Sequence, residues 1–248
     1  MVWRVARRLD QALAGQHLTA TDFRVPQLAT ADLAGATVRG TSTRGKHLLT
    51  RLDHASGAWT LHTHLKMEGI WRVVERGRRW PQPAHHARVV LTTADRSAVG
   101  FRLGVVELLP RDAERTALAH LGPDLLGDDW DEEEAVRRLR THPDAAVFDA
   151  LRDQTSLAGL GTIWAAETCF TIGLHPTRTV AEVADLTRTV RVARLKLRQS
   201  IAARAPLPMA VYGRERAACR RCGTPVERIE MAAEGRPRAA YFCPHCQR

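Results

Sequence analysis

Lysine, aromatic residues and long apolar runs are scarce in this sequence. Only three of its 37 basic residues are lysine, and Phe, Trp and Tyr make up 5% of its 248 residues. No apolar run approaches the length of a transmembrane helix, and the arginine-bearing N-terminus lacks the apolar run and the small-residue cleavage site of a secretory signal. We therefore expect a cytoplasmic protein with no membrane partner.

Acidic residues are outnumbered by basic ones. The formal net charge is +10 and the isoelectric point is about 10.4, which favours a partner rich in phosphate, such as nucleic acid. Residues 214–248 alone hold eight arginines against four glutamates. A generally basic soluble protein is the alternative that charge leaves open, but this local excess favours nucleic acid.

The pattern of apolar residues changes along the chain. Short apolar runs separated by turn residues predict the strands of a sandwich or barrel at 17–25, 36–45, 46–52, 58–65, 70–74, 87–93 and 105–110. Helical periodicity follows at 129–139, 144–153, 161–174 and 183–205, after a first helix that starts at Val2. The tail from Tyr212 is short and rich in arginine and cysteine. We see no internal repeat and no low-complexity linker.

Four of the five cysteines have the spacing of a structural zinc site. Cys219 and Cys222 form one Cys-x2-Cys pair, and Cys243 and Cys246 form a second pair twenty residues later. Four thiolates complete a tetrahedron and leave no open position for catalysis. A disulfide pair and an iron site are the alternatives, and the full set of cysteines disfavours His245 as a ligand. Cys169, within an apolar helical stretch, is expected to be a buried core thiol.

The segment between the two cysteine pairs fits a β-hairpin that turns near Gly235 and Pro237. Arg236 and Arg238 would project from this hairpin. An arginine on a zinc-pinned hairpin can grip a phosphate at a smaller cost in entropy than one on a mobile tail. Solvated surface arginines are the alternative for each of them.

Several segments together resemble one protein family. They are TRGKHLL at 43–49, HLKMEGIWRVV at 64–74, HLGPDLL at 120–126, DQTSLAGLGTIWAAE at 153–167, VYGRERAACRRCGT at 211–224 and EGRPRAAYFCPHCQR at 234–248. Taken in this order, they are similar to the formamidopyrimidine-DNA glycosylase and endonuclease VIII family, and more closely to its endonuclease VIII-like branch. The resemblance covers essentially the whole chain.

The resemblance implies an α+β multidomain fold. We expect an N-terminal β-sandwich domain flanked by helices at 1–126, a helical helix-two-turns-helix DNA-binding domain at 127–211 and a four-cysteine zinc finger at 212–248. The implied function is that of a base-excision-repair DNA glycosylase and abasic-site lyase, which acts on oxidised bases and abasic sites by base flipping and Schiff-base elimination. The implied partner is damaged DNA, the cofactor is one structural zinc ion, and the expected state is a monomer associated with the bacterial nucleoid through DNA.

The resemblance also assigns roles to residues of the N-terminal half. Lys46 matches the family's catalytic-site lysine, placed near the lesion phosphate and implicated in proton transfer. An exposed turn lysine is the alternative, but an amine whose pKa is lowered can exchange protons near neutrality and a guanidinium cannot, which gives weight to one of only three lysines. His64 matches a phosphate-contacting histidine, and Met67 matches an apolar wedge that fills the gap left by the flipped base. Without the resemblance, Met67 would be taken as core.

Further roles fall in the C-terminal half. Gly161 and the following residue lie where the family brings backbone N–H groups to a phosphate. The family usually has Asn after this glycine, so Thr162 predicts weaker phosphate binding there. Arg238 matches the finger arginine that binds the phosphate beside the lesion and assists elimination, with Arg236 as a close competitor.

The first helix raises a question about activity. No Ser, Thr, Asp or Asn precedes Val2 as a cap, whereas the family has Pro-Glu-Gly-Asp-Thr there, with Pro as nucleophile and Glu as acid. We therefore expect a start a few codons upstream, and efficient borohydride trapping only with those residues present. The alternative is a catalytically impaired or inactive lesion-binding protein, or a weak lyase using Lys46 or the Met1 amine. A zinc-ribbon protein unrelated to repair is a third hypothesis. The sequence identifies no preferred lesion, and residues 76–87 predict no interpretable pocket.

Overall fold

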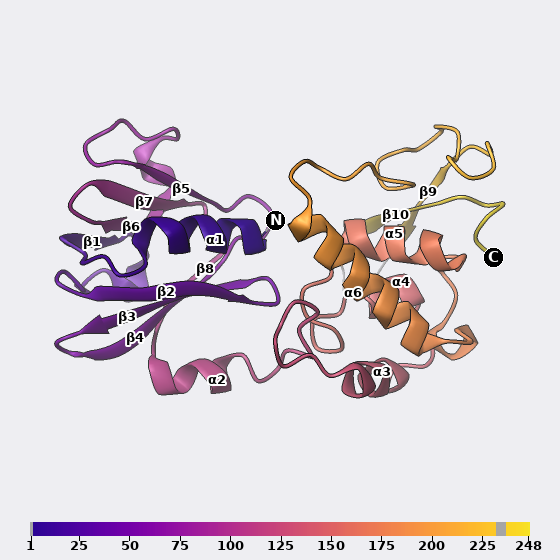
Figure 1. Ribbon diagram of the computed structural model, residues 1–248, viewed down its shortest axis with the longest axis horizontal. Coiled ribbons are helices and arrows are strands. Elements are labelled where there is room, and N and C mark those ends of the chain that lie inside the picture. The colour runs from indigo at the N-terminus through magenta and orange to yellow at the C-terminus, as the bar shows by residue number, and fades with distance from the viewer. Residues whose placement is uncertain (1, 232–236) are drawn as a thin grey trace. The chain divides into compact units, whose positions relative to one another are not determined.

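The computed structural model describes residues 2–231 and 237–248 of the chain. The chain divides into two compact units, Met1–Ala119 and His120–Arg248 (Figure 1). Strands are the main regular structure of the first unit, and helices are the main regular structure of the second. None of the helices among the described residues is long and apolar enough to cross a membrane.

The first unit begins with helix α1 (Val2–Leu13), as the sequence predicts. Its residues Ala6, Leu9 and Leu13 recur at helical spacing and are buried, so one face of the helix joins the core. The Asp10 carboxylate accepts a hydrogen bond of 2.8 Å from the backbone N–H of Thr41, which fixes the helix to strand β2. Figure 1 shows α1 lying close to that strand.

Two four-stranded antiparallel sheets complete the first unit. The first has the order β2 (Thr37–Arg44), β3 (His47–His54), β4 (Gly57–His64), β8 (Val105–Pro110). The second has the order β1 (Ala20–Phe23), β6 (Ala87–Thr92), β7 (Arg96–Phe101), β5 (Ile70–Glu75). Leu48 and Leu61 of the first sheet share one core with Leu91 of the second and with α1, which confirms the predicted sandwich. Short helices border the strands: η1 (Pro26–Leu28), η2 (Ala84–His86), η3 (Arg111–Ala113) and α2 (Glu114–Ala117).

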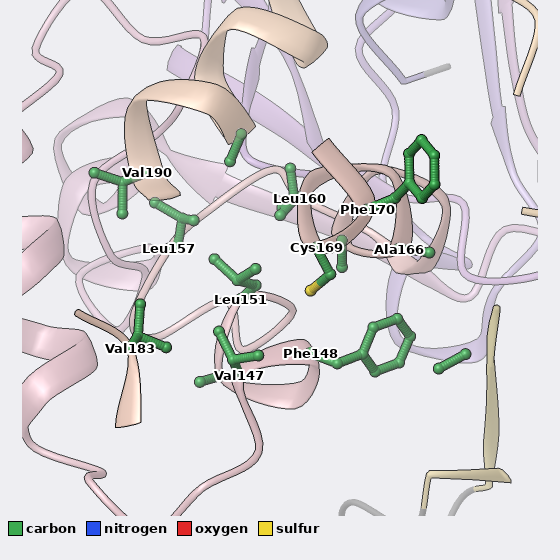
Figure 2. Close-up of a cluster of buried hydrophobic side chains, with 14 of the residues drawn as sticks. Val147, Phe148, Leu151, Leu157, Leu160, Ala166, Cys169, Phe170, Val183 and Val190 are labelled. Atoms are coloured by element: carbon green, nitrogen blue, oxygen red, sulfur yellow. The ribbon is translucent and has the colours of Figure 1, made fainter. Parts of the chain in front are cut away.

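Helices dominate the second unit. They are α3 (Glu132–Arg140), α4 (Val147–Ala150), η4 (Val180–Glu182), α5 (Thr162–Ile172) and α6 (Leu186–Ala202). The side chains of Asp131 and Asp185 cap α3 and α6, because each carboxylate accepts a backbone N–H of the first turn. Figure 2 shows the side chains of Phe148, Leu151 and Cys169 within the common core of this unit.

The second unit ends in the predicted antiparallel hairpin, β9 (Glu227–Met231) and β10 (Arg238–Phe242). Val226, Met231 and Ala240 belong to the same buried cluster as the helices, so the hairpin packs on the helical core. The predicted combination of sandwich, helical region and C-terminal finger with strands is therefore confirmed. Cys169 is fully buried, as predicted, and burial raises the pKa of its thiol to about 12.

Candidate nucleic-acid interface and metal centre

Lys46 lies in the tight turn between strands β2 and β3. Arg44 pairs directly with His47, so the turn consists of Gly45 and Lys46 alone. Gly45 has φ of 58°, a left-handed value that glycine adopts without a steric cost and that favours it at the first position of such a turn. The sequence therefore fixes the lysine at one end of the first sheet.

His64 lies at the same end of this sheet, as the last residue of β4. It pairs across the strands with His47, and the centroids of the two rings are 4.8 Å apart. Its Nδ1 accepts a hydrogen bond of 2.9 Å from the backbone N–H of Lys66, so the neutral ring carries its proton on Nε2. Burial, and then the positive charges of Lys66 and Lys46, lower its pKa to about 4. At neutral pH, His64 is therefore an uncharged hydrogen-bond donor.

Met67 lies in the loop that follows His64. Its side chain is 76% exposed, the highest value among the exposed large hydrophobic residues of the described chain. The loop closes through a hydrogen bond of 2.8 Å from the Gly69 N–H to the Leu65 carbonyl. A Cβ on Gly69 would lie 2.3 Å from that carbonyl oxygen, so the close turn that presents Met67 requires glycine at 69. The methionine is thus exposed, which a wedge requires, while its role as a wedge stays a prediction.

The outer face of the first sheet carries polar residues that the sequence analysis did not identify. His47 Nδ1 lies 2.7 Å from His62 Nε2, and His62 Nδ1 lies 2.8 Å from the carboxylate of Glu107. Further along the face, the Glu114 carboxylate accepts hydrogen bonds from Arg51 and Thr60. The period-two spacing of His62 and His64 along one strand was the available signal, because it places both side chains on the same face.

The helix-two-turns-helix segment is held by Gln154. Its amide donates to the carbonyl oxygens of Arg152 at 2.6 Å and Leu160 at 2.9 Å, and its Oε1 accepts from the N–H of Gly159. Gly159 has φ of 101°, which favours glycine at that position. The glutamine thus fixes the shape of the loop that leads into α5.

Gly161 is the N-cap residue of helix α5, and Thr162 is its first residue. No side chain of the described residues caps this end. The backbone N–H groups of the first turn of a helix have no partner within the helix, and the helix dipole adds positive potential there. The end of α5 therefore has donors of the kind that bind anions, while phosphate binding by these two residues stays a prediction.

Glu167, further along α5, was not anticipated from the sequence. Its side chain is buried, and its two oxygens accept hydrogen bonds of 2.9–3.1 Å from the backbone N–H groups of Ala210, Val211 and Tyr212. Three backbone donors satisfy a buried carboxylate that would otherwise be costly. Glu167 thereby fixes the segment that leads into the finger.

Cys219, Cys222, Cys243 and Cys246 gather at the base of the hairpin. Their sulfur atoms all lie within 4.8 Å of one another, and Cys222 Sγ is 3.5 Å from Cys243 Sγ. The Arg221 backbone N–H donates to Cys219 Sγ at 3.4 Å, a contact that favours a thiolate at this position. Desolvation, and then hydrogen bonds with the neighbouring cysteines, raise the pKa of Cys246 to about 12. A divalent cation would offset this cost, so the four cysteines fit one structural zinc ion.

The structure describes only one of the two finger arginines. Arg238 is the first residue of β10, paired with Met231 across the hairpin. It is partly buried at the start of the strand. Arg236 lies outside the described residues. The assignment of a phosphate contact to Arg238 stays a prediction.

These features define a nucleic-acid-binding class of protein: a β-sandwich with a lysine and a histidine at one end, a helix-two-turns-helix segment and a four-cysteine finger. Residues 2–102 match the family model of the formamidopyrimidine-DNA glycosylase N-terminal domain, and residues 218–248 match the zinc finger found in FPG and IleRS. The chain belongs to the formamidopyrimidine-DNA glycosylase and endonuclease 8 family, whose members are DNA glycosylases and abasic-site lyases.

Relatives support this assignment over nearly the whole chain. The chain is 46% identical to the probable endonuclease 8 2 of Streptomyces coelicolor, over 99% of this chain and 92% of the relative. It is 42% identical to the DNA-(apurinic or apyrimidinic site) lyase Nei2 of Mycolicibacterium smegmatis, over 99% and 96%. The Lactococcus lactis formamidopyrimidine-DNA glycosylase, solved non-covalently bound to DNA with an abasic site, is 25% identical, with a TM-score of 0.84 over 99% of this chain and 97% of that chain.

The comparisons bear on the hypotheses left open by the sequence. Family membership excludes a zinc-ribbon protein unrelated to repair, because the similarity extends over 99% of this chain and is not confined to the finger. The alternative of a catalytically impaired or inactive lesion-binding protein gains no support, since the relatives are named as endonucleases and a lyase.

Proposed function

We propose that this chain is a base-excision-repair DNA glycosylase with abasic-site lyase activity, acting on oxidised bases and abasic sites by base flipping and Schiff-base elimination. The observation that carries the proposal is the group of residues at one end of the first sheet. Lys46 in its turn, the uncharged donor His64 and the exposed Met67 all lie there. These residues supply an amine, a phosphate ligand and an apolar wedge, the three groups that processing of a flipped nucleotide requires.

Lys46 is proposed to transfer protons near the lesion phosphate. Two of the three lysines of the chain, Lys46 and Lys66, contribute the positive charge that lowers the pKa of His64. The same positive charge attracts a phosphate oxygen, to which His64 donates its Nε2 proton. An amine can also give up a proton in the reaction, which the 34 arginines of the chain cannot do.

The second unit is proposed to hold the DNA backbone. The open end of α5 at Gly161 and Thr162 offers backbone N–H groups to a phosphate, and Thr162 can add one hydroxyl donor. Arg238, with Arg236 as the competitor, would bind the phosphate beside the lesion and assist elimination. The zinc ion bound by the four cysteines would keep β9 and β10 in place and would take no part in the reaction.

Three further features are part of the proposal. The domains would run from 1 to 126, from 127 to 211 and from 212 to 248. The protein would act as a monomer on damaged DNA. It would work in the cytoplasm of a bacterium, associated with the nucleoid through DNA. Its net charge of +10 favours binding to DNA whatever the base sequence.

The test compares three lysine variants on a duplex with one abasic site. We expect Lys46→Ala to lower the single-turnover rate of strand cleavage by about 10²–10⁴-fold, the usual contribution of a general acid or base. Lys46→Arg should keep DNA affinity but leave cleavage low, because a guanidinium stays protonated. Lys196→Ala, which removes the lysine of helix α6, is the matched control and should cleave at the wild-type rate. Wild-type cleavage by Lys46→Ala would overturn the proposal.

A further inference from the structure

A groove lies between helix α1 and strand β5 of the first unit. Its volume is about 390 Å³, and residues of α1 and β5 line it together with Arg96, the first residue of β7. Its floor is apolar, because Leu9 and Trp71 are buried in the core of the unit and Val73 packs against that core. The floor is therefore part of the folded core and exists before any partner binds.

Arginine side chains surround this floor and form a positive rim. They are Arg8 of α1, Arg72 of β5 and Arg96 of β7, and all three are exposed. None of the described residues that line the groove is acidic. Asp95, beside the groove, lies 3.3 Å from Arg96. Within the described part of the chain, Arg8 and Arg72 have no acidic partner, so their charges are available to a ligand.

Strand β5 also offers backbone groups to a partner. It is the last strand of its sheet, so one of its sides has no neighbouring strand among the residues that the structure describes. Alternate residues of such a strand direct N–H and C=O groups to the open side, where an extended peptide can add. A nucleic acid backbone has no apolar side chain for the floor and no strand of its own for this edge. The groove therefore favours a peptide.

The groove and the residue proposed as the wedge occupy different parts of the first unit. Arg96 pairs with Glu75, the last residue of β5, whereas Met67 lies in the loop before the first residue of that strand. The groove thus follows β5 away from Met67. A peptide bound in the groove would leave this loop accessible, so its binding would be a property beyond the proposed function.

We propose that the groove binds an extended, acidic segment of a partner protein. Apolar side chains of the segment would cover the floor, and its carboxylates would pair with the arginines of the rim. Successive side chains of an extended chain point to opposite faces. A segment that alternates acidic and apolar residues therefore presents one apolar face to the floor, while its long acidic side chains reach the rim.

The first experiment measures the binding of labelled peptides to the full chain by fluorescence anisotropy. The probe is a six-residue peptide of alternating glutamate and leucine, which is as long as β5. We expect saturable binding at micromolar concentrations, weakened by salt because the ion pairs are exposed. A peptide of alternating glutamate and serine should bind about tenfold more weakly, because it leaves the floor uncovered. Equal binding of the two peptides, or no binding of the probe, would overturn the proposal.

Arginine variants test whether the rim supplies the charge. Arg8→Gln combined with Arg72→Gln should weaken binding of the glutamate-leucine peptide about tenfold, the scale of two exposed ion pairs. The matched control combines Arg7→Gln with Arg76→Gln, which removes the same charge from exposed residues of the same unit that do not line the groove. The control should bind as the wild-type protein does. Equal losses in the two double variants would show attraction by net charge alone and would overturn the proposal.

Amide spectra of the ¹⁵N-labelled protein locate the bound peptide. The signals of residues 71–73 on β5 and of Arg8 and Gln11 on α1 should shift with the glutamate-leucine peptide, and those of Lys46 and Met67 should stay in place. A single-stranded oligothymidine is the competing probe. If it displaces the peptide and shifts the same groove signals, the groove is a nucleic-acid surface and the proposal is wrong. Shifts confined to residues outside the groove would also overturn it.

Discussion

In the proposed function, the two units would recognise phosphate with different chemistry. In the first unit, the end of the sheet presents an amine at Lys46 and an imidazole at His64. In the second unit, the corresponding groups would be the backbone N–H donors at the start of α5 and an arginine of the finger, which the four-cysteine cluster supports. The first arrangement is suited to a reaction, and the second is suited to a firm grip on the DNA backbone.

The two units also hold these groups in place by different means. The first unit fixes its residues by the strand register, since the pairs Arg44–His47 and His47–His64 place one turn and one loop at the same sheet end. The second unit uses single polar anchors, namely Gln154 in the loop, Glu167 on α5 and the cysteine cluster. A sheet distributes its support over many hydrogen bonds, whereas an anchor concentrates it in one side chain. Substitutions should therefore have larger structural effects in the second unit.

The largest effect is expected from loss of a zinc ligand. Cys243→Ser should release the one bound zinc ion and lower DNA affinity at least about 100-fold, because the strands β9 and β10 have only five residues each and structural zinc supplies much of the folding free energy of small fingers. Metal analysis and binding titrations would measure both changes. Hydrogen exchange should show the first unit intact.

Cys169→Ser is the control for this experiment. It removes the fifth cysteine, which lies in the helical core outside the cluster. The variant should keep one equivalent of zinc. If Cys243→Ser also keeps its zinc ion, the assignment of the metal centre is wrong.

A smaller effect is expected from the anchor on α5. Glu167→Gln replaces a buried acceptor of three backbone N–H groups by an amide with one acceptor oxygen. The free energy of unfolding of the second unit should fall by about 3 kcal/mol, the scale of lost hydrogen bonds to a buried charge. Chemical denaturation would measure it, with the exposed Glu133→Gln of helix α3 as the control. If Glu167→Gln and Glu133→Gln unfold with equal free energies, Glu167 does not anchor the segment that leads into the finger.

Met67→Ala is expected to act on binding alone. The affinity for an abasic-site duplex should fall about tenfold, because the apolar side chain no longer fills the gap in the base stack. Its melting temperature should not change, since the residue is 76% exposed. Leu195→Ala, at a 54% exposed leucine of α6, is the matched control. It should bind the abasic-site duplex and an undamaged duplex as tightly as the wild-type protein does. An equal loss of affinity for undamaged DNA would contradict the role as a wedge.

The smallest effect concerns acid stability of the first unit. The pKa of His64 is lowered to about 4 from an ordinary value of 6.5, first by burial and then by Lys66, Lys46 and His62. The unfolded chain therefore binds this proton more readily than the folded protein, and stability falls as pH drops from about 6.5 towards 4. His64→Gln should make the melting temperature less sensitive to pH in this range. The exposed His85→Gln is the control, and identical slopes in all three proteins would refute the interpretation.

The fold was predictable where local patterns agree with the tertiary structure. Seven of the strands in the first unit follow the predicted apolar runs, and α5 and α6 lie within the predicted helical segments. Strand β7 was missed because Ser97, Ala98 and Gly100 have little β-propensity, and its central position between β6 and β5 makes it a strand. The predicted helix at 144–153 is only Val147–Ala150. It is short because Ala146 is extended and bridges to Thr179.

The candidate site was predictable to a different degree. The four zinc ligands follow from cysteine spacing, because this chemistry has few alternatives at that spacing. Lys46, His64, Met67, Gly161 and Thr162 came from short motifs, and their roles stay predictions. Glu167 and Glu107 carry no local signal, because their partners are distant in the sequence and only packing brings them together.

Local sequence is sufficient for the zinc ligands, the succession of strands and helices, and the tight turn that holds Lys46, since each depends on residues that are near one another along the chain. Which distant side chains meet depends on the folded structure. Antiparallel pairing brought Glu107 to His62 and His47, and packing of α5 brought Glu167 to the backbone of Ala210. The physical reason is that hydrogen bonds between distant residues depend on register and packing, which a linear pattern does not specify.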